Sequence, residues 1–374
     1  MLHNEIIYQI FVRNYSKEGT FKKVEEDLDR IKDLGVDIIY LMPIHEIGVK
    51  NRKGTFGSPY AIKDYFSITP DYGSKDDFVS LINKTHEKGM KLIIDMVFNH
   101  TSPDNILVKE HPEYYFYKNG KMGNRVGDWS DIVDLDTHRE DTQEYLVSVL
   151  KYWVSLGVDG FRFDVASMIP LSFFQKARKE LGKDIIFIGE SIDEWFFEHL
   201  KSIGDSPTPD AEMFPTFDSL YNYSWWKYLD NYLNNKGDLD SLVKALNRDE
   251  KLLFKKGIRM NCLENHDVDR IAKMTKGRNL KEYIHFISYI KGQLFLYAGQ
   301  EYGITHKPNL FEKDPVVWEK DKNIYDMYLK MIQFKKKQKD EENVFQRFSR
   351  LNNNTIEVAK YKDDQLIDKL QFTL

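Results

Sequence analysis

Amphipathic segments alternate with short apolar runs along most of the chain, and in four places a glycine ends the amphipathic segment. VEEDLDRIKDLG precedes VDIIYLMP, DDFVSLINKTHEKG precedes MKLIIDMVF, TQEYLVSVLKYWVSLG precedes VDGFRFDV, and LSFFQKARKELG precedes KDIIFIGE. Each amphipathic segment is typical of a surface helix, and its glycine fits a helix C-terminal cap. The apolar runs are rich in Ile, Val and Phe, which indicates parallel strands buried on both faces.

This alternation of helices and strands predicts a parallel α/β fold. The candidate strands are IIYQIFV, DIIYLMP, KLIIDMV, GFRFDV, IIFIGE, a weak one near residues 211–216, IRMNCLE and QLFLYAG. Eight strands favour a closed (β/α)8 TIM barrel, and the chain exceeds the ~250 residues of a typical barrel, which leaves room for loop insertions. The alternative is an open doubly wound sheet, which usually carries a glycine-rich phosphate loop that this sequence lacks.

The predicted barrel spans residues 1–337 and contains two long insertions. Residues 101–139 are rich in Pro, Gly, Asn and Tyr, and we expect them to form a reduced loop subdomain after the third strand, before a helix that starts near Asp141. A second long loop is expected over residues 49–78, between the second strand and the second helix. Residues 338–374 contain FQRFS, TIEVAKY and DKLQFTL, which indicate a short C-terminal β region of antiparallel strands.

Composition and charge narrow the class of protein. The formal net charge of the 374 residues is −5 and no segment is strongly basic, which argues against nucleic acid as a partner. The single cysteine, Cys262, excludes a disulfide framework within the chain. No run approaches the ~20 apolar residues of a membrane span, and the first residues lack a signal-peptide pattern. We therefore expect a soluble cytoplasmic protein that binds neither membrane nor nucleic acid.

Acidic residues recur at the C-terminal ends of the predicted strands; they are Asp95, Asp164, Glu190, Glu264 and Asp267. In a barrel these ends converge on one rim, which carries the active site. Arg162 and Asp164 are two residues apart on one strand, so both point inward. Carboxyl groups crowded in a semi-enclosed site raise one another's pKa, so one can donate a proton while its neighbour stays ionised. Glycosidic bond cleavage needs this division of roles.

Two other interpretations of these polar residues remain open on residue type alone. The first is a set of buried structural ion pairs, since such networks also perturb carboxyl groups. The second is a metal site, because Asp, Glu and His ligate zinc or iron and both His100 and His266 follow an asparagine at a strand end. The sequence has no HExxH motif and no pair of histidines on one strand.

Eight segments of the chain resemble one known family. DMVFNH, GFRFD, IGE and ENHD, in this order and spacing, resemble the four signature segments of the α-amylase superfamily of glycoside hydrolases. LGVDIIYLMPI, GSPYAIKDYFSITPDYGSKDDF, DWSDIVDLD and GQLFLYAGQE resemble further segments of that family. The resemblance extends from Glu5 to about Lys337. It implies a (β/α)8 barrel that acts on α-glucans by a retaining mechanism, with an oligosaccharide substrate and no cofactor.

The resemblance also implies roles for individual residues. Asp164 would be the nucleophile that forms a covalent glycosyl-enzyme intermediate. Glu190 would be the general acid and then the general base. Asp267 would bind sugar hydroxyls and favour the distorted, oxocarbenium-like ring. These roles imply a retaining reaction with the two carboxyl groups ~5–5.5 Å apart.

Four further matching positions would contact the substrate or support the nucleophile. Arg162 would orient Asp164, His100 and His266 would hydrogen-bond the sugar, and Tyr60 would stack on it. Three tryptophans are additional candidate platforms for sugar rings, with core packing expected for at least one; they are Trp129, Trp225 and Trp226.

The sequence departs from the family where many α-amylases have a Lys-His pair that serves substrate and calcium. Ser167 and Met168 occupy these positions, so no metal site is expected. The leading hypothesis is a hydrolase that cleaves α-glucosidic bonds in maltodextrin-like oligosaccharides. The alternatives are an α-glucanotransferase on the same site, a non-catalytic sugar-binding barrel, and a metal-dependent barrel hydrolase.

Overall fold

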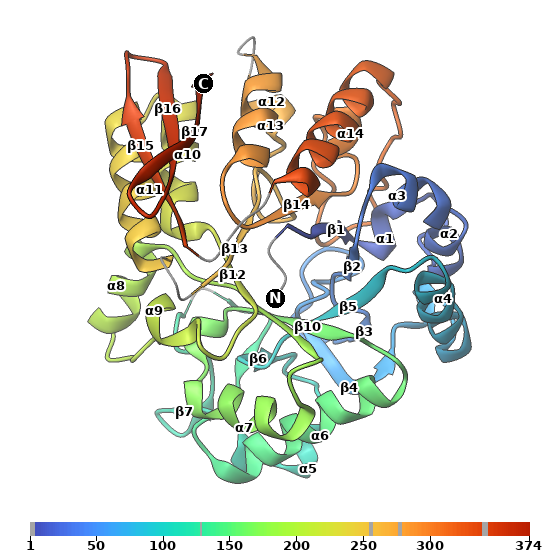
Figure 1. The fold of residues 1–374 in the computed structure, drawn as a ribbon. Coiled ribbons are helices and arrows are strands. Elements are labelled where there is room, and N and C mark those ends of the chain that lie inside the picture. Colours follow the sequence, from blue (N-terminus) through green and yellow to red (C-terminus); the bar gives the residue numbers. More distant parts are fainter. Residues whose placement is uncertain (1–3, 128, 254–256, 276–278, 339–342) are drawn as a thin grey trace.

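A closed barrel of eight parallel strands forms the centre of the protein (Figure 1). The computed structural model describes residues 4–127, 129–253, 257–275, 279–338 and 343–374. The strands follow one another around the barrel in the order β1-β14-β13-β12-β11-β10-β5-β2. Their bounds are β1 Ile6–Ile10, β2 Ile38–Leu41, β5 Lys91–Met96, β10 Gly160–Phe163, β11 Ile186–Gly189, β12 Ser219–Tyr221, β13 Arg259–Asn261 and β14 Gln293–Tyr297. The predicted (β/α)8 barrel is confirmed.

Helices between the strands cover the outside of the barrel. The longer ones are α4 Lys75–Glu87, α6 Glu140–Ser155, α7 Leu171–Leu181, α8 Glu194–Ser202, α10 Tyr223–Leu233, α11 Leu239–Leu253, α13 Leu280–Tyr289 and α14 Lys322–Lys337. The shorter ones are α1 Val12–Tyr15, α2 Phe21–Glu25, α3 Leu28–Leu34, α5 Leu107–Glu110, α9 Asp210–Met213 and α12 Ile271–Met274. No helix in the described ranges is long and apolar enough to cross a membrane.

The four glycines that were predicted to end helices all adopt backbone angles that other residues rarely reach. Their φ angles are positive: 97° at Gly35, 67° at Gly89, 102° at Gly157 and 87° at Gly182. Each lies at or just after the end of its helix, α3, α4, α6 or α7. The absence of a Cβ atom permits this conformation and lets the chain turn back into the next strand.

The predicted position of the sixth strand is wrong. Residues 211–216 lie in α9 and the turn that follows it, and the strand is β12 at Ser219–Tyr221. Met213 and Phe217 are four residues apart and both buried, and the Phe217 amide donates to the Met213 carbonyl. This helical spacing, and not the two-residue period of a strand, fits the apolar positions of the segment.

The two insertions contain more regular structure than the sequence predicted. The expected loop over residues 49–78 includes β4 (Ile62–Ile68), which pairs with β3 (His45–Ile47), and a 3-10 turn, η1 (Pro70–Tyr72). Within residues 101–139, β9 (Val133–Asp134) pairs with β6 (His100–Thr101), and β7 (Tyr117–Lys118) pairs with β8 (Lys121–Met122). A turn, η2 (Pro112–Tyr114), follows α5.

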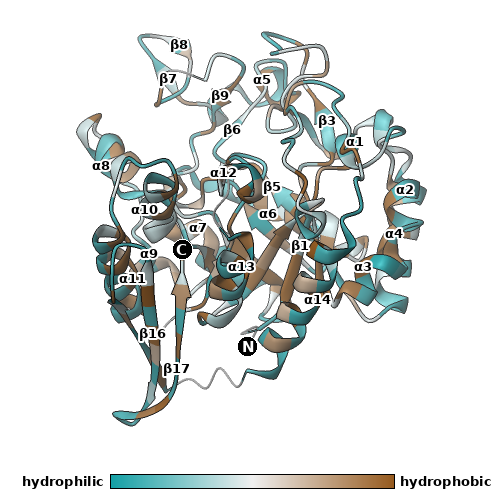
Figure 2. Cartoon of the chain, turned by 90° about the horizontal axis from the view of Figure 1, so that it is seen from above, coloured by the Kyte–Doolittle hydropathy of each residue, from teal (hydrophilic) through white to brown (hydrophobic). Residues whose placement is uncertain are grey.

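The C-terminal residues form the antiparallel strands that were predicted. The three-stranded sheet consists of β15 (Val344–Arg350), β16 (Thr355–Lys362) and β17 (Gln365–Thr373). The sheet packs on the barrel helices, where the Phe372 ring contacts the Phe286 ring of α13 at 5.6 Å between centroids. Figure 2 shows β16 and β17 reaching toward the end of the barrel opposite to β7, β8 and α8.

Side chains fill the interior of the barrel. Phe295 of β14 contacts Tyr40 of β2 at 6.2 Å and Tyr221 of β12 at 6.1 Å between ring centroids. The Arg162 guanidinium of β10 lies 5.4 Å from the centre of the Tyr221 ring. None of these contacts joins neighbouring strands, so they cross the barrel interior, as in other barrels of this type.

Candidate active site

Arg162 is the centre of the polar network at the C-terminal end of the barrel. It is fully buried, and its Nη1 donates to both oxygens of Asp95 at 2.8 and 3.0 Å. The same nitrogen donates to Oδ1 of Asp164 at 2.9 Å, and Nη2 lies 2.9 Å from Oε1 of Glu190 as an ion pair without hydrogen-bond alignment. One guanidinium therefore gathers three carboxyl groups from three adjacent strands.

Strand register places Asp164 and Glu190 side by side. Phe163 of β10 pairs with Gly189 of β11, so the two carboxyl-bearing residues directly follow a paired position. The Glu190 amide then donates to the Phe163 carbonyl at 3.0 Å. Both side chains are largely buried, with 8% of Asp164 and 7% of Glu190 exposed.

Val165 has a strained backbone next to this pair. Its φ of 37° and ψ of 46° lie in the left-handed region, which a β-branched residue rarely occupies. This conformation directs its amide to Oε2 of Glu190, at a distance of 2.6 Å. Strain of this kind persists only where surrounding structure enforces it, and it occurs often at functional sites.

The pKa values of Asp164 and Glu190 are both raised. Burial raises the pKa of Glu190 to about 7, with a further increase from the charge of Asp267 and a decrease from Arg162. Burial also raises the pKa of Asp164, which Arg162 lowers and Glu190 raises. Because Glu190 raises the pKa of Asp164 and the two groups share one guanidinium, the pair retains a proton near neutral pH.

Tyr60 and His266 lie against one another beside Asp95. The Tyr60 hydroxyl donates to Oδ2 of Asp95 at 2.9 Å and lies 2.6 Å from Nε2 of His266. The two rings are stacked, with centroids 5.2 Å apart and planes 11° apart. Nε2 of Gln9 donates to Nδ1 of His266 at 2.9 Å, so both ring nitrogens of the buried imidazole have partners. Burial lowers the pKa of His266, which keeps the imidazole neutral.

Asp267 is exposed to solvent, in contrast to the buried carboxyl groups around Arg162. Its side chain is 48% exposed, and Oδ2 lies 3.2 Å from Nε2 of His266. The Asp267 amide donates to Oδ1 of Asn265 at 2.8 Å, and its carbonyl accepts from Nζ of Lys307 at 3.0 Å. Its charge also raises the pKa of Glu190. The main chain of Asp267 is thus fixed while its carboxylate faces solvent.

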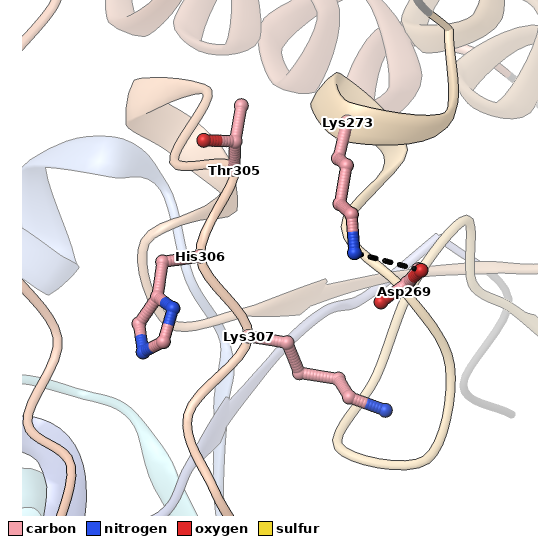
Figure 3. A pocket seen from close by; sticks show the side chains of 5 residues that line it. All are labelled: Asp269, Lys273, Thr305, His306 and Lys307. Atoms are coloured by element: carbon pink, nitrogen blue, oxygen red, sulfur yellow. Dashed lines mark hydrogen bonds and ion pairs between the residues drawn. The ribbon is translucent and has the colours of Figure 1, made fainter.

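A pocket of about 480 Å³ lies between residues 269–273 and residues 305–307 (Figure 3). It is lined by Asp269, Lys273, Thr305, His306 and Lys307. Nζ of Lys273 pairs with Oδ2 of Asp269 at 3.1 Å, and His306 pairs with Asp314 at 2.8 Å. Lys307 links this pocket to the loop that carries Asp267.

His100 lies next to Tyr60 and contacts Trp129. Burial lowers the pKa of His100 to about 4, against opposing effects of Asp131 and the Tyr60 main chain. Nδ1 of His100 is 3.2 Å from Nδ2 of Asn99, and its ring lies 5.7 Å from the Trp129 ring. The neutral imidazole is therefore suited to hydrogen bonding and not to holding an anion.

Two of the three candidate tryptophan platforms are core residues. Trp225 and Trp226, both on α10, are 2% and 6% exposed. Trp225 packs edge-on against Phe286, and Nε1 of Trp226 donates to the Leu263 carbonyl at 3.1 Å. Among the three, Trp129 is partly exposed and lies beside a predicted site residue.

Sequence analysis missed part of the support for this site. Asp95 was identified as a rim carboxylate without a role, and Tyr40, whose hydroxyl donates to Asp95 at 2.5 Å, was not identified. Gln9, which holds His266, was also missed. The sequence does place these two polar side chains inside apolar strands, Gln9 in IIYQIFV and Tyr40 in DIIYLMP. A polar atom buried in such a strand requires a hydrogen-bond partner, which was the available signal.

Within the part of the chain that the structure describes, no three His, Cys, Asp or Glu side chains are grouped as metal ligands. The buried carboxyl groups Asp95, Asp164 and Glu190 have Arg162 as their common cation. That the site needs no metal stays a prediction.

Comparison with known proteins connects this geometry to one family. The family model described as "Alpha amylase, catalytic domain" matches residues 9–129 and 126–354. Alpha-amylase 3 of Dictyoglomus thermophilum is 26% identical, and the match covers 87% of this chain and 70% of that protein. The chain also matches alpha-amylase 2 of the same organism and spans 63% of its length.

Two crystal structures of similar proteins agree with this match. An alpha-amylase from Lactobacillus plantarum is 37% identical with a TM-score of 0.85, covering 96% of this chain and 88% of its own. A noncanonic maltogenic alpha-amylase from Thermotoga neapolitana is 34% identical with a TM-score of 0.84, covering 96% and 83%. With the family model matching nearly the whole barrel, the chain belongs to the α-amylase family of glycosidases.

Proposed function

We propose that this protein is a retaining glycosidase that cleaves α-glucosidic bonds of maltodextrin-like oligosaccharides through a covalent glycosyl-enzyme intermediate. The observation that carries the proposal is the shared contact of Asp164 and Glu190 with Arg162, at 2.9 Å each. The two residues follow paired positions on adjacent strands, which are ~4.8 Å apart. This spacing favours the ~5–5.5 Å separation of a retaining pair over the wider inverting arrangement.

The proposed reaction divides the work between the two carboxyl groups. Glu190, with a pKa of about 7 that results from burial, protonates the leaving glycosidic oxygen. The Asp164 carboxylate attacks the anomeric carbon and forms a glycosyl ester. The ionised Glu190 then takes a proton from water, whose oxygen attacks the anomeric carbon, and the bond from that carbon to Asp164 breaks and releases the carboxylate. Arg162 holds both groups in place throughout and stabilises the ionised partner at each stage.

The residues around the pair would bind the sugar at the cleavage position. Asp267 has an exposed carboxylate that can accept two neighbouring sugar hydroxyls. His100 is neutral, so it can donate one hydrogen bond to a hydroxyl. The N–H of neutral His266 already faces the Tyr60 hydroxyl, so a sugar hydroxyl would have to share or displace that contact. Tyr60 supplies a flat ring for the apolar face of a pyranose, and its stacking on His266 fixes the plane of that ring.

An α-glucanotransferase shares this intermediate and differs only in the attacking group, which is a sugar hydroxyl in place of water. A non-catalytic sugar-binding barrel would not need two adjacent carboxyl groups that share one guanidinium, and the contacts of Asp164 and Glu190 with Arg162 argue against it. A cytoplasmic location belongs to the same proposal, and the single cysteine of the sequence fits a reducing compartment.

Time-resolved NMR of maltoheptaose cleavage tests the proposal. A retaining enzyme first releases the α-anomer, and product chains longer than seven units would reveal transfer. Glu190→Gln should lower kcat by at least about 1,000-fold, because the glutamine amide cannot donate the proton that the general acid supplies. Glu319→Gln makes the same chemical change at an exposed position and should leave the rate unchanged. Initial release of the β-anomer, or equal turnover by Glu190→Gln, would disprove the assignment.

A further inference from the structure

Trp195 is the most exposed large hydrophobic residue of the described chain. It is 74% exposed and lies on α8, the helix that follows the strand carrying Glu190. Its indole is stacked on the imidazole of His199, with centroids 5.6 Å apart and planes 6° apart. One face of the indole is therefore supported by a parallel ring, while most of the remaining surface faces solvent.

A row of ring contacts connects Trp195 to the candidate active site. The His199 ring lies 6.3 Å from the Phe196 ring at 16°, and Phe196 lies 6.3 Å from Trp129. Trp129 in turn contacts the His100 ring at 5.7 Å. The rings come from α8 on one side and from the insertion after β5 on the other, at the barrel end that carries the acidic residues.

The helix that presents Trp195 is held in place at its first turn. Oδ1 of Asp193 accepts from the Phe196 amide at 2.8 Å, which caps the helix. Glu194 accepts from the Tyr228 hydroxyl at 3.1 Å and pairs with Arg248 at 3.1 Å, which ties α8 to α10 and α11. A platform ordered before binding costs little conformational entropy when a ligand binds to it.

We propose that this ring row, defined as Trp129, Phe196, His199 and Trp195, binds additional glucosyl units of the substrate and so makes the enzyme select longer oligosaccharides. The proposal rests on the function proposed above and adds a chain-length preference to it. Each pyranose has an apolar face that packs on a flat ring, and the ring edges and His199 nitrogens supply weak polar contacts. Continuity of the row with His100 favours a bound substrate chain over a protein partner, since a partner surface would not need to reach the cleavage position.

The test compares long and short substrates in Trp195→Ala. The variant should lower kcat/KM for maltoheptaose about 5- to 20-fold, the loss expected for one stacking contact. For p-nitrophenyl α-glucoside, which ends at the cleavage position, the change should stay within about twofold. Trp195→Phe should recover most of the loss. Ile367→Ala, which also removes an exposed apolar side chain but lies on β17 (53% exposed), should behave as the unchanged protein on both substrates.

Two outcomes would contradict the ring row alone, and a third would contradict the function proposed above as well. Equal kcat/KM of Trp195→Ala and wild type on maltoheptaose, with cleavage of the short substrate intact, overturns the ring row alone. A change of molecular mass in light scattering on Trp195→Ala without any kinetic effect also overturns it, in favour of a protein partner. If the wild type cleaves neither substrate, and calorimetry with Glu190→Gln detects no maltoheptaose binding, the function proposed above fails together with the ring row.

Discussion

The Tyr60 hydroxyl lies 2.6 Å from Nε2 of His266 while the two rings are stacked at 11°. The carboxylate of Asp95 can only accept, so Tyr60 donates its proton to Asp95 and accepts a hydrogen bond from His266. Gln9 donates to the other ring nitrogen of His266. The network therefore fixes the imidazole of His266 in one tautomer, with its proton on Nε2, the nitrogen nearest Asp267. It also fixes the ring of Tyr60, which is proposed to contact the sugar.

Tyr60→Phe keeps the ring and removes the hydroxyl that joins Asp95 to His266. We expect kcat/KM for maltoheptaose to fall about 10- to 100-fold, because a small misplacement of the groups around the reacting centre can cost about 100-fold. The free energy of unfolding should change by about 1 kcal/mol or less, since Arg162 and Tyr40 still bind Asp95. Steady-state kinetics and urea unfolding measure the two effects.

Tyr40→Phe is the matched control, because it removes another hydroxyl from the same oxygen of Asp95 without touching His266. It should lower stability by about 1 kcal/mol and activity less than Tyr60→Phe does. A larger kinetic effect of Tyr40→Phe than of Tyr60→Phe would contradict the role given to the Tyr60–His266 contact.

Val165→Gly tests whether the left-handed backbone serves the Glu190 contact. Glycine relieves about 1–2 kcal/mol of strain at this conformation and adds about 0.5–1 kcal/mol of backbone entropy cost, so stability should rise by no more than about 1.5 kcal/mol. The freed backbone should hold its amide less firmly against Glu190, and kcat should fall about tenfold. Val165→Ala retains a Cβ in the strained region and should keep more activity than glycine. Full activity of Val165→Gly would show that the strain has no catalytic role.

The pH dependence of kcat/KM, which reports groups of the free enzyme, should have a basic limb near pH 7. Burial raises the pKa of Glu190 to about 7, and the general acid must be protonated to act. Activity should therefore fall as the pH rises above about 7, because Glu190 then loses its proton. Rate measurements with a slowly reacting maltooligosaccharide locate this limb. A limb near the ordinary glutamate value of 4.5 would mean that burial does not control this group.

The free energy of unfolding should also depend on the protonation of Glu190, and it should fall as the pH rises. The folded state holds the proton of Glu190 up to about pH 7, whereas the unfolded chain releases it near 4.5. The stability contributed by protonated Glu190 is complete below about pH 4.5 and is lost as the pH rises through about 7. Between pH 5 and pH 8 the free energy of unfolding should fall more in the wild type than in Glu190→Gln, in which this group cannot ionise. Parallel pH profiles of the two proteins would refute this linkage.

The sequence predicted most of the fold because its local signals agree with one another. Gly35 and Gly182, for example, end helices in a conformation that only glycine adopts easily, and an apolar strand follows each. The sixth strand was misplaced because β12 has three residues, too few to show a period, whereas the neighbouring apolar segment is helical. Short strands gain their stability from neighbours in the barrel and not from their own residues.

For the site, the sequence indicated which side chains face the rim but not which ones touch. Asp164 and Arg162 could be placed on one face from their spacing alone. The contact of Tyr60 with His266 joins residues 206 positions apart in the chain, and no local pattern encodes such a contact. The exposure of Trp195 and burial of Trp225 likewise depend on packing between elements that a single sequence does not reveal.

Trapping of the glycosyl-enzyme tests the central claim most directly, namely that Asp164 and Glu190 act as a retaining pair held by Arg162. Glu190→Gln incubated with α-maltosyl fluoride, whose leaving group needs no acid, should accumulate a covalent maltosyl ester, because the base for its hydrolysis is absent. Peptide mass spectrometry should locate this ester on Asp164. Modification of another residue, or release of maltose with inverted configuration and no adduct, would contradict the account.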